Sequence, residues 1–181
     1  MGRNAKNISQ SSLWRFDLLM VLVMLGTQNN SFHRLLEEID TLIDKGMINE
    51  KVVVQAGYTK YQPNNEKMKI LDFISKDALD ELEQEANFII THGGVGSIIT
   101  SLEKGKKVIA VPRLHEYGEH VNNHQTEIVE KFNKDGNIIG IKSVKELEEA
   151  IKKINDFIPK TYIGNNSRML KLIENFIDNI K

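Results

Sequence analysis

Cysteine is absent from this chain of 181 residues, and only three prolines are present. Without thiols the chain can form neither a disulfide scaffold nor a thiolate metal site, and its composition suits a reducing compartment. So few prolines leave no proline-rich linker that would divide the chain. A formal net charge of −1 lacks the basic excess typical of nucleic-acid binding. These absences favour one globular domain without a nucleic-acid partner.

Long hydrophobic runs are also missing. The longest, Leu18 to Leu25, is far shorter than the ~20 residues that cross a bilayer, and no signal-peptide cleavage site follows it. This run predicts a buried first strand beginning at Met20, which is also a candidate alternative start. The polar segment before it predicts a loosely held extension over residues 1–19, followed by one domain over residues 20–181.

The chain alternates short apolar runs with segments of helical periodicity. Short β-branched runs predict strands, and apolar residues three and four positions apart predict helices. Strands are expected at Met20–Leu25, Val52–Gln55, Lys69–Ile74, Phe88–Thr91, Val108–Val111 and Asn137–Ile141. Helices are expected from the cap Ser31 to Gly46, and at Ala78–Glu85, Ile98–Lys104, Val144–Phe157 and Ser167–Ile180. This alternation predicts a doubly wound α/β fold, Rossmann-like, with a mostly parallel sheet covered on both faces.

A glycine-rich segment, Thr91 to Ser97, follows the apolar run Phe88 to Ile90 and precedes a predicted helix. Glycines at such a turn let backbone amides approach a phosphate, and the helix N-terminus adds partial positive charge. A tight turn without a ligand would also use glycines here. The next strand ends at Pro112 and Arg113 and leads into a polar loop, so two strand ends present polar groups to one sheet edge. Ligands bind at that edge in open α/β folds.

Four motifs in this order resemble the C-terminal domain of glycosyltransferase family 28. The likeness extends from about Met20 to the C-terminus and is strongest to small stand-alone proteins similar to the catalytic subunit of the two-component N-glycan GlcNAc transferase. The motifs are Leu25-Gly26-Thr27, His92-Gly93-Gly94-Val95-Gly96-Ser97, Gly105-Lys106 with Val111-Pro112-Arg113, and Asn123-His124-Gln125.

The resemblance implies one half of a GT-B glycosyltransferase, the half that binds a UDP-sugar. It further implies a membrane-anchored partner subunit that binds the acceptor, and a cytoplasmic location at the inner face of the membrane through that partner. The implied reaction is metal-independent transfer of a hexose, with β-1,4-linked galactose as the first candidate. The implied acceptor is a polyprenyl-diphosphate-linked saccharide in capsule or exopolysaccharide synthesis.

The resemblance also implies donor contacts. The backbone amides of Gly94, Gly96 and Ser97 would hold the diphosphate, Gly93 would belong to the same donor-binding turn, and His92 would lie against the donor phosphates or sugar. His92 has a second reading, in which its ring only satisfies a backbone carbonyl. Thr27 and Gln28 are expected to reach the diphosphate across the cleft, or to serve simple turn chemistry.

Further along the chain, Asn123, His124 and Gln125 correspond to the family position that contacts sugar hydroxyls, because amides both donate and accept. An exposed first helical turn is the alternative for these three. Arg113 is expected to pair with a phosphate or with acidic groups of the partner, or to form an ordinary surface salt bridge. Glu119 and His120 are the nearby acid-base candidates, but neither is assigned as the base, since the acceptor subunit can supply one.

One departure from the family lies at Thr100, where many relatives carry a glutamate that binds the ribose. Glu103, one turn later, is a possible substitute if the geometry shifts. The departure supports an alternative function, a non-catalytic accessory subunit. A nicotinamide-dependent oxidoreductase is less favoured, because Gly26 to Asn30 lacks three spaced glycines and the second strand ends at Gln55 instead of an acidic residue.

Overall fold

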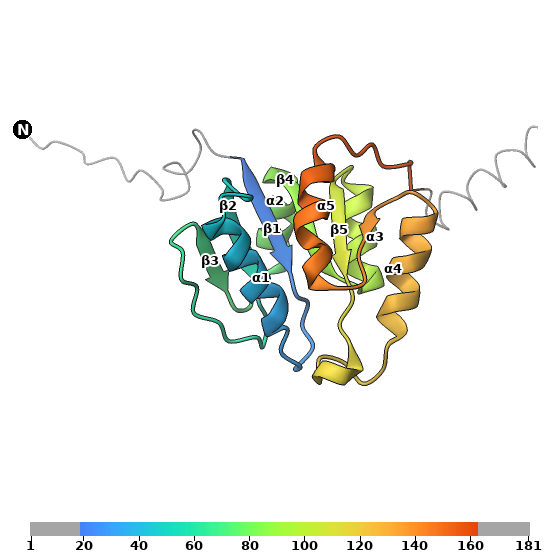
Figure 1. Ribbon diagram of the computed structural model, residues 1–181. Coiled ribbons are helices and arrows are strands. Elements are labelled where there is room, and N and C mark those ends of the chain that lie inside the picture. The colour runs from blue at the N-terminus through green and yellow to red at the C-terminus, as the bar shows by residue number, and fades with distance from the viewer. Residues whose placement is uncertain (1–18, 163–181) are drawn as a thin grey trace, which may run out of the picture.

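The computed structural model describes residues 19–162, which form a six-stranded sheet (Figure 1). All neighbouring strands are parallel, in the order β3-β2-β1-β4-β5-β6. This order is that of a doubly wound fold and confirms the predicted class. The strands are β1 (Met20–Met24), β2 (Lys51–Gln55), β3 (Met68–Leu71), β4 (Ala86–His92), β5 (Lys107–Val111) and β6 (Ile139–Gly140).

Helices cover both faces of the sheet (Figure 1). α1 and α5 lie on one face, and α2, α3 and α4 lie on the other. Their bounds are α1 (His33–Asp44), α2 (Lys76–Glu85), α3 (Val95–Glu103), α4 (His124–Lys134) and α5 (Leu147–Ile154), with short 3-10 turns η2 (His115–Tyr117) and η3 (Val144–Glu146).

The core follows from the two-residue period of the strands. On β1, Val21 and Val23 pack toward α1 and α5, whereas Leu22 and Met24 face the side of α2. All four side chains are at most 2% exposed. A strand buried on both faces must be apolar throughout, which accounts for the continuous apolar run in the sequence.

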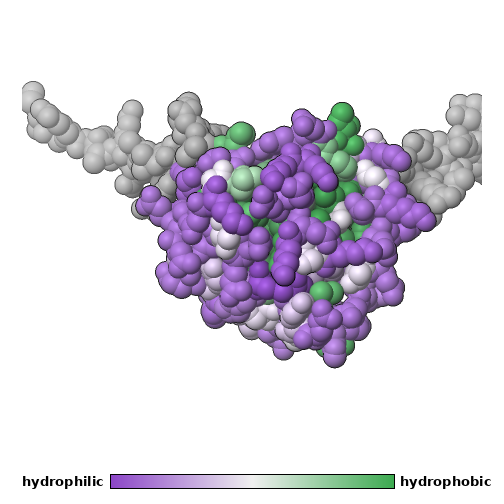
Figure 2. Space-filling model, in the orientation of Figure 1, coloured by the Kyte–Doolittle hydropathy of each residue, from purple (hydrophilic) through white to green (hydrophobic). Residues whose placement is uncertain are grey.

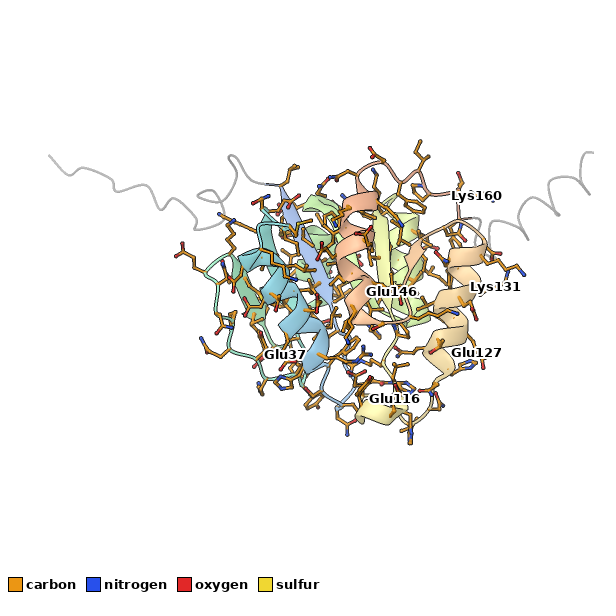
Figure 3. All side chains as sticks on the ribbon, in the orientation of Figure 1. Glu37, Glu116, Glu127, Lys131, Glu146 and Lys160 are labelled. Carbon is orange, nitrogen blue, oxygen red and sulfur yellow. The ribbon has the colours of Figure 1, made fainter. Side chains whose placement is uncertain are left out.

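Charged side chains occupy the outward faces of the helices. Glu37 on α1, Glu146 ahead of α5 and Lys131 on α4 all point away from the sheet (Figure 3). The space-filling view of the same side is correspondingly hydrophilic over α1 and α5 (Figure 2). Within residues 19–162, no helix has the length and apolar character needed to cross a membrane.

Some predicted boundaries differ from the structure. β3 ends at Leu71 rather than Ile74, because Leu71 is the last residue in register with β2, opposite Gln55. Phe73 and Ile74 therefore leave the sheet and become part of a loop. The sequence analysis also missed most of α4, whose first turn was considered only as an alternative. The expected helix Ser167–Ile180 and the extension over residues 1–18 lie outside the described residues.

The predicted cap at Ser31 is wrong. The N-cap of α1 is Phe32, which makes no side-chain capping bond. Instead, the Phe32 amide donates to the Thr59 hydroxyl at 3.1 Å, so the loop after β2 completes the start of α1. A cap provided by a residue 27 positions away leaves no local signal in the sequence.

Asp40 anchors the connection between β2 and β3 to α1. Its carboxylate is 2% exposed and accepts hydrogen bonds from the Tyr61 hydroxyl at 3.0 Å and the Asn64 amide at 2.8 Å. Burial, together with the hydrogen bond to this carboxylate, raises the pKa of Tyr61 to about 12.

We expect Asp40→Ala to lower the free energy of unfolding by about 1–3 kcal/mol, because the Asn64 amide and Tyr61 hydroxyl lose their acceptor. Glu37→Ala, at an exposed position of the same helix, is the matched control and should change stability by less than ~0.5 kcal/mol. Urea denaturation followed by circular dichroism measures both. Equal effects of the two substitutions would contradict the anchoring role.

Candidate functional site

A pocket of about 340 Å³ opens at the carboxyl ends of the strands. It lies where the strand order reverses between β1 and β4, which is the usual ligand position in doubly wound sheets. The predicted edge is therefore confirmed, although the pocket centres on β1 and β4 rather than on β4 and β5. Its lining consists of Met24, Gly26, Thr27, Gln28, Gln55, Phe73, Ile74, Leu79, His92, Gly94, Gly96 and Ser97.

The N-terminus of α3 forms one wall of this pocket. Gly94 is its N-cap and offers no side chain, and the first helical bond is donated by the Ile98 amide to the Gly94 carbonyl at 3.2 Å. The amides of the first turn, including those of Gly96 and Ser97, therefore have no acceptor within the helix. With the helix dipole behind them, these amides can bind an anion.

His92 lies between two glycines at the base of the pocket. It is 8% exposed, and its Nδ1 lies 3.3 Å from the carbonyl oxygen of Met24. A Cβ added to Gly26 would come within 2.7 Å of ring atom Cε1, and one added to Gly94 would come within 2.3 Å of Nε2. Both glycines are therefore required by their close approach to the imidazole.

The environment of His92 disfavours the charged ring. Burial, and next the positive charge of Arg113, lower the pKa of His92 to about 4, and the hydrogen bond to Met24 only partly opposes them. The expected contact of the ring with a backbone carbonyl is therefore present. The same ring also lines the pocket, so the donor-binding hypothesis keeps a geometric basis.

Gln55 holds the loop after β1. Its Oε1 accepts a hydrogen bond from the Gly26 amide, and its Nε2 donates to the Gly26 carbonyl, both at 3.1 Å. Gly57 passes so close that a Cβ there would lie 2.4 Å from the Gly26 oxygen. The sequence analysis used Gln55 only to argue against a dinucleotide site and missed this structural role.

Arg113 is buried inside the loop framework and is 1% exposed. Its guanidinium donates to the carbonyls of Leu25 at 2.8 Å, Asn30 at 2.6 Å and Glu119 at 3.3 Å. Burial lowers the pKa of Arg113 to about 10, against the opposing charge of Glu119, so the residue stays cationic at neutral pH. The predictions of a surface salt bridge or of contact with a partner are wrong, and Arg113 is not among the residues that line the pocket.

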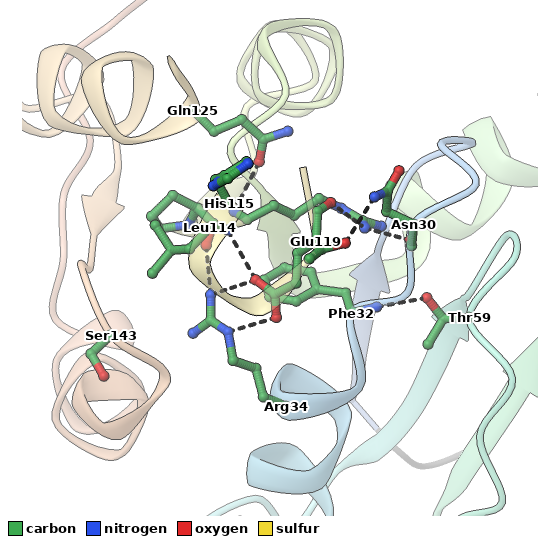
Figure 4. A network of polar contacts seen from close by, with 12 residues as sticks. Asn30, Phe32, Arg34, Thr59, Leu114, His115, Glu119, Gln125 and Ser143 are labelled. Atoms are coloured by element: carbon green, nitrogen blue, oxygen red, sulfur yellow. Dashed lines mark hydrogen bonds and ion pairs between the residues drawn. The ribbon is translucent and has the colours of Figure 1, made fainter. Parts of the chain in front are cut away.

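Glu119 is fully engaged and does not face a substrate as a free base. Arg34 donates to its two oxygens at 2.6 and 2.8 Å, and the Leu114 amide donates to it at 3.0 Å (Figure 4). His120, the other acid-base candidate, places Nε2 at 3.2 Å from Nε2 of Gln28 in the first loop. The loop after β5 is thereby joined to the loop after β1.

Gln125 connects the loops after β4 and β5. Its Oε1 accepts from the Gly93 amide at 3.1 Å and the Arg113 amide at 3.0 Å (Figure 4). Gly93 is needed for this contact, since a Cβ there would lie 2.8 Å from Cβ of Gln125. Asn123 accepts from the His115 amide at 2.8 Å, and His124 forms an exposed pair with Glu127 at 3.1 Å.

The structure thus divides the predicted donor contacts into three groups. Thr27, Gln28, His92, Gly94, Gly96 and Ser97 line the pocket. Gly93, Arg113 and Gln125 belong to the buried framework behind it. Asn123 and His124 lie on the exposed first turn of α4, as their alternative reading expected.

Thr100 is tied to a neighbouring helix. Its hydroxyl lies 3.3 Å from Oε1 of Glu83, a carboxylate on α2 that is 2% exposed and paired with Lys104. Glu103 is the last residue of α3, about 12 Å along the axis from Val95 at 1.5 Å per residue. The suggested substitution by Glu103 is therefore wrong, because that side chain lies at the far end of the helix.

Four apolar residues of the pocket were not predicted as functional, namely Met24, Phe73, Ile74 and Leu79. Phe73 is 54% exposed and packs edge-on against Tyr58, with ring centroids 5.0 Å apart. The sequence offered no separate signal for them, because each lay within a predicted strand or helix. Among residues 19–162, no three His, Asp or Glu side chains converge in a way that could hold a metal ion.

Comparison with known proteins gives a consistent assignment. Residues 20–180 match the glycosyltransferase family 28 C-terminal domain. The UDP-N-acetylglucosamine transferase subunit ALG13 of Mus musculus is 41% identical over 63 residues, which are 35% of this chain and 5% of that protein. The subunit of the same name from Candida glabrata is 34% identical over 101 residues, 54% of this chain and 49% of that protein. The chain therefore spans half or less of these relatives.

Solved structures share the fold at low sequence identity. A solution structure of ALG13 aligns with a TM-score of 0.56 and 18% identity, over 86% of this chain and 95% of that one. The UDP-GlcNAc 2-epimerase of Methanocaldococcus jannaschii aligns with a TM-score of 0.56 and 16% identity, over 94% and 49%. Because a transferase subunit and an epimerase share it, the fold alone does not decide the reaction.

The two pocket glycines give a matched test of the geometry. We expect Gly94→Ala to lower the free energy of unfolding by about 1–3 kcal/mol, because the added methyl would overlap the His92 ring. Gly96→Ala meets no atom within 4 Å and lies in the first turn of α3, so it should be neutral or stabilising by up to ~1 kcal/mol. Thermal and urea denaturation compare the variants, and equal destabilisation would refute the described packing of His92.

Proposed function

We propose that this chain is the donor-binding subunit of a UDP-sugar-dependent glycosyltransferase. The chain belongs to the family defined by the glycosyltransferase family 28 C-terminal domain. One observation carries the proposal: the pocket at the switch point of the sheet combines free amides at the start of α3 with an apolar wall. The amides can bind an anionic group, and the apolar wall can bind an aromatic base. A nucleoside diphosphate carries both of these groups.

Each part of the donor has a place in this pocket. The diphosphate lies at the amides of Gly96 and Ser97, within reach of Thr27 across the opening. The uracil packs against Phe73, which is 54% exposed, and against the partly buried Ile74 of the same wall. The sugar then extends toward Gln28, where the loops after β1 and β5 meet.

The chemistry assigned to this chain is stabilisation of the leaving group. In the transfer, an acceptor oxygen bonds to the anomeric carbon while the bond from that carbon to the diphosphate breaks, and negative charge grows on UDP. The α3 amides are fixed in advance at that position and need no reorganisation as the charge develops. The proton of the acceptor hydroxyl goes to a base on the partner, because Glu119 is already held by Arg34.

A second subunit completes the enzyme. The names of the curated relatives describe them as subunits, and this chain supplies one donor-type domain. Exposed apolar side chains lie on the segments that follow β2, β3, β4 and β5, at the same edge of the sheet as the pocket, a distribution that suits a protein surface closing over the site. These side chains are Tyr58, Phe73, Val95, Tyr117 and Val121.

The acceptor in this proposal is a lipid-linked saccharide presented by a membrane-anchored partner, as the family resemblance implies. Two donor sugars are candidates. Galactose follows from the likeness to capsule and exopolysaccharide enzymes, and N-acetylglucosamine follows from the names of the curated relatives. Direct competition between the two UDP-sugars for the pocket distinguishes them.

A non-catalytic accessory subunit is the second candidate, and Thr100 favours it. The residue that replaces the ribose-binding glutamate of relatives is engaged by Glu83 and offers no carboxylate to the ribose. The two functions differ in donor binding, which an accessory would not require.

Calorimetric titration of the full chain with UDP, UDP-N-acetylglucosamine, UDP-galactose and UDP-glucuronate tests the proposal. We expect UDP to bind, and Gly96→Ala to weaken that binding at least tenfold, since Gly96 lines the pocket and an added methyl group would take up open space beside the amides proposed to hold the diphosphate. Absence of binding to every UDP species would favour the accessory function. Unchanged affinity in Gly96→Ala would place the donor elsewhere.

Removal of divalent cations gives a separate test. Because the proposal assigns the diphosphate to backbone amides, we expect UDP affinity to change less than twofold between excess EDTA and millimolar Mg²⁺. The same titration run in both conditions measures it. A tenfold or larger loss in EDTA would show that a metal ion neutralises the diphosphate.

A further inference from the structure

The hydrogen bonds of His92 fix where its proton sits. The Met24 carbonyl oxygen can only accept, and it lies 3.3 Å from Nδ1, so Nδ1 carries the hydrogen. The Thr91 hydroxyl lies 3.4 Å from Nδ1 and 3.2 Å from the same carbonyl, and we assign its hydrogen to the nearer oxygen. In the neutral ring the lone pair is therefore on Nε2.

That lone pair is on the side of the ring where the donor phosphates are proposed to bind. Nε2 is the ring atom nearest to Gly94, the N-cap of α3, with a separation of 2.3 Å from an ideal Cβ there. The diphosphate of a UDP-sugar is a diester without an ionisable hydroxyl at neutral pH, so its oxygens only accept. A neutral His92 with its hydrogen on Nδ1 would set the lone pair of Nε2 against those of a phosphate oxygen, and a ring turned over would lose the contact of Nδ1 with the Met24 carbonyl.

The charges facing His92 explain why the ring is neutral before an anion arrives. Arg113 and His120, both from the loop after β5, raise the cost of protonation, as does the positive end of α3. From β1 and β2 the neighbours are the Met24 carbonyl and the uncharged Gln55. The carboxylate of Glu119 is nearby on the β5 loop but is neutralised by Arg34.

We propose that His92 takes up one proton at Nε2 when a nucleoside diphosphate binds, and that the resulting imidazolium donates a charge-assisted hydrogen bond to a phosphate oxygen. This inference rests on the proposed function, because it requires the donor in this pocket. The proton comes from solvent and returns to solvent when UDP leaves, so the balance of the transfer reaction is unchanged. During transfer the imidazolium faces the charge that develops on the leaving group.

Donor binding and protonation of His92 favour each other in this proposal. Binding of the anion raises the pKa of His92 from its value of about 4 in the empty pocket, so donor affinity is highest at low pH. Between the pKa of the free protein and the raised pKa of the complex, the affinity falls tenfold for each unit of rising pH. Above the raised pKa it becomes independent of pH.

The test is calorimetric titration of the full chain with UDP-N-acetylglucosamine and, separately, UDP-galactose between pH 5.5 and 8, in buffers of different ionisation enthalpy. We expect the dependence of the heat on the buffer to report uptake of close to one proton at the acidic end. His92→Gln retains an amide donor but cannot titrate, so its heat should not depend on the buffer. His120→Gln, which removes the neighbouring histidine, should retain proton uptake.

Nitrogen-15 spectra of the histidine rings in the wild-type protein give a second readout that needs no variant. We expect Nε2 of His92 to show the shift of an unprotonated nitrogen in the free protein and of a protonated one in the complex. Binding without proton uptake, with Nε2 still unprotonated, would overturn this inference and leave the proposed function intact. No binding of either UDP-sugar at any pH would overturn both.

Discussion

The buried guanidinium of Arg113 is the interaction on which the arrangement of the site depends. It donates hydrogen bonds to the carbonyls of Leu25 and Asn30 in the loop after β1 and of Glu119 in the loop after β5. These two loops are separated by more than 80 residues in sequence. A buried cation is costly unless its hydrogen-bonding capacity is used, so these carbonyls are held firmly in place. The loops after β1 and β5 are consequently fixed relative to each other before any ligand arrives.

Around this cation, uncharged amide side chains complete the framework. Gln125 joins the loops after β4 and β5, and Gln55 holds Gly26 against the ring of His92. The polar part of the pocket is then formed by backbone amides, short polar side chains and one imidazole, and no carboxylate lines it. Such a surface suits a dianionic ligand. Burial, and next the same Arg113 charge that organises the loops, keep His92 neutral in the empty state.

Features that depend on local residue patterns and on the order of strands and helices could be predicted from the sequence. Features that depend on contacts between distant residues could not. Apolar runs and helical periods located every strand of the described sheet, and the glycine turn after β4 identified the start of α3, which forms one wall of the pocket. The structural role of Arg113 could not be predicted from the sequence, because the burial of this side chain depends on which loops cover the end of β5. The cap of α1 was misassigned for the same reason, since Thr59 replaces Ser31 from another loop. Phe73 was placed in a strand because its apolar neighbours hid the end of the register with β2.

A donor pocket at the start of α3 can be tested by titrating the ¹⁵N-labelled chain with UDP and following the amide chemical shifts. If UDP binds there, we expect the largest shifts at Gly26, Gly94, Gly96 and Ser97. Shifts confined to the second surface hollow, where Lys131, Lys134 and Lys160 lie, or no shifts at all, would contradict it.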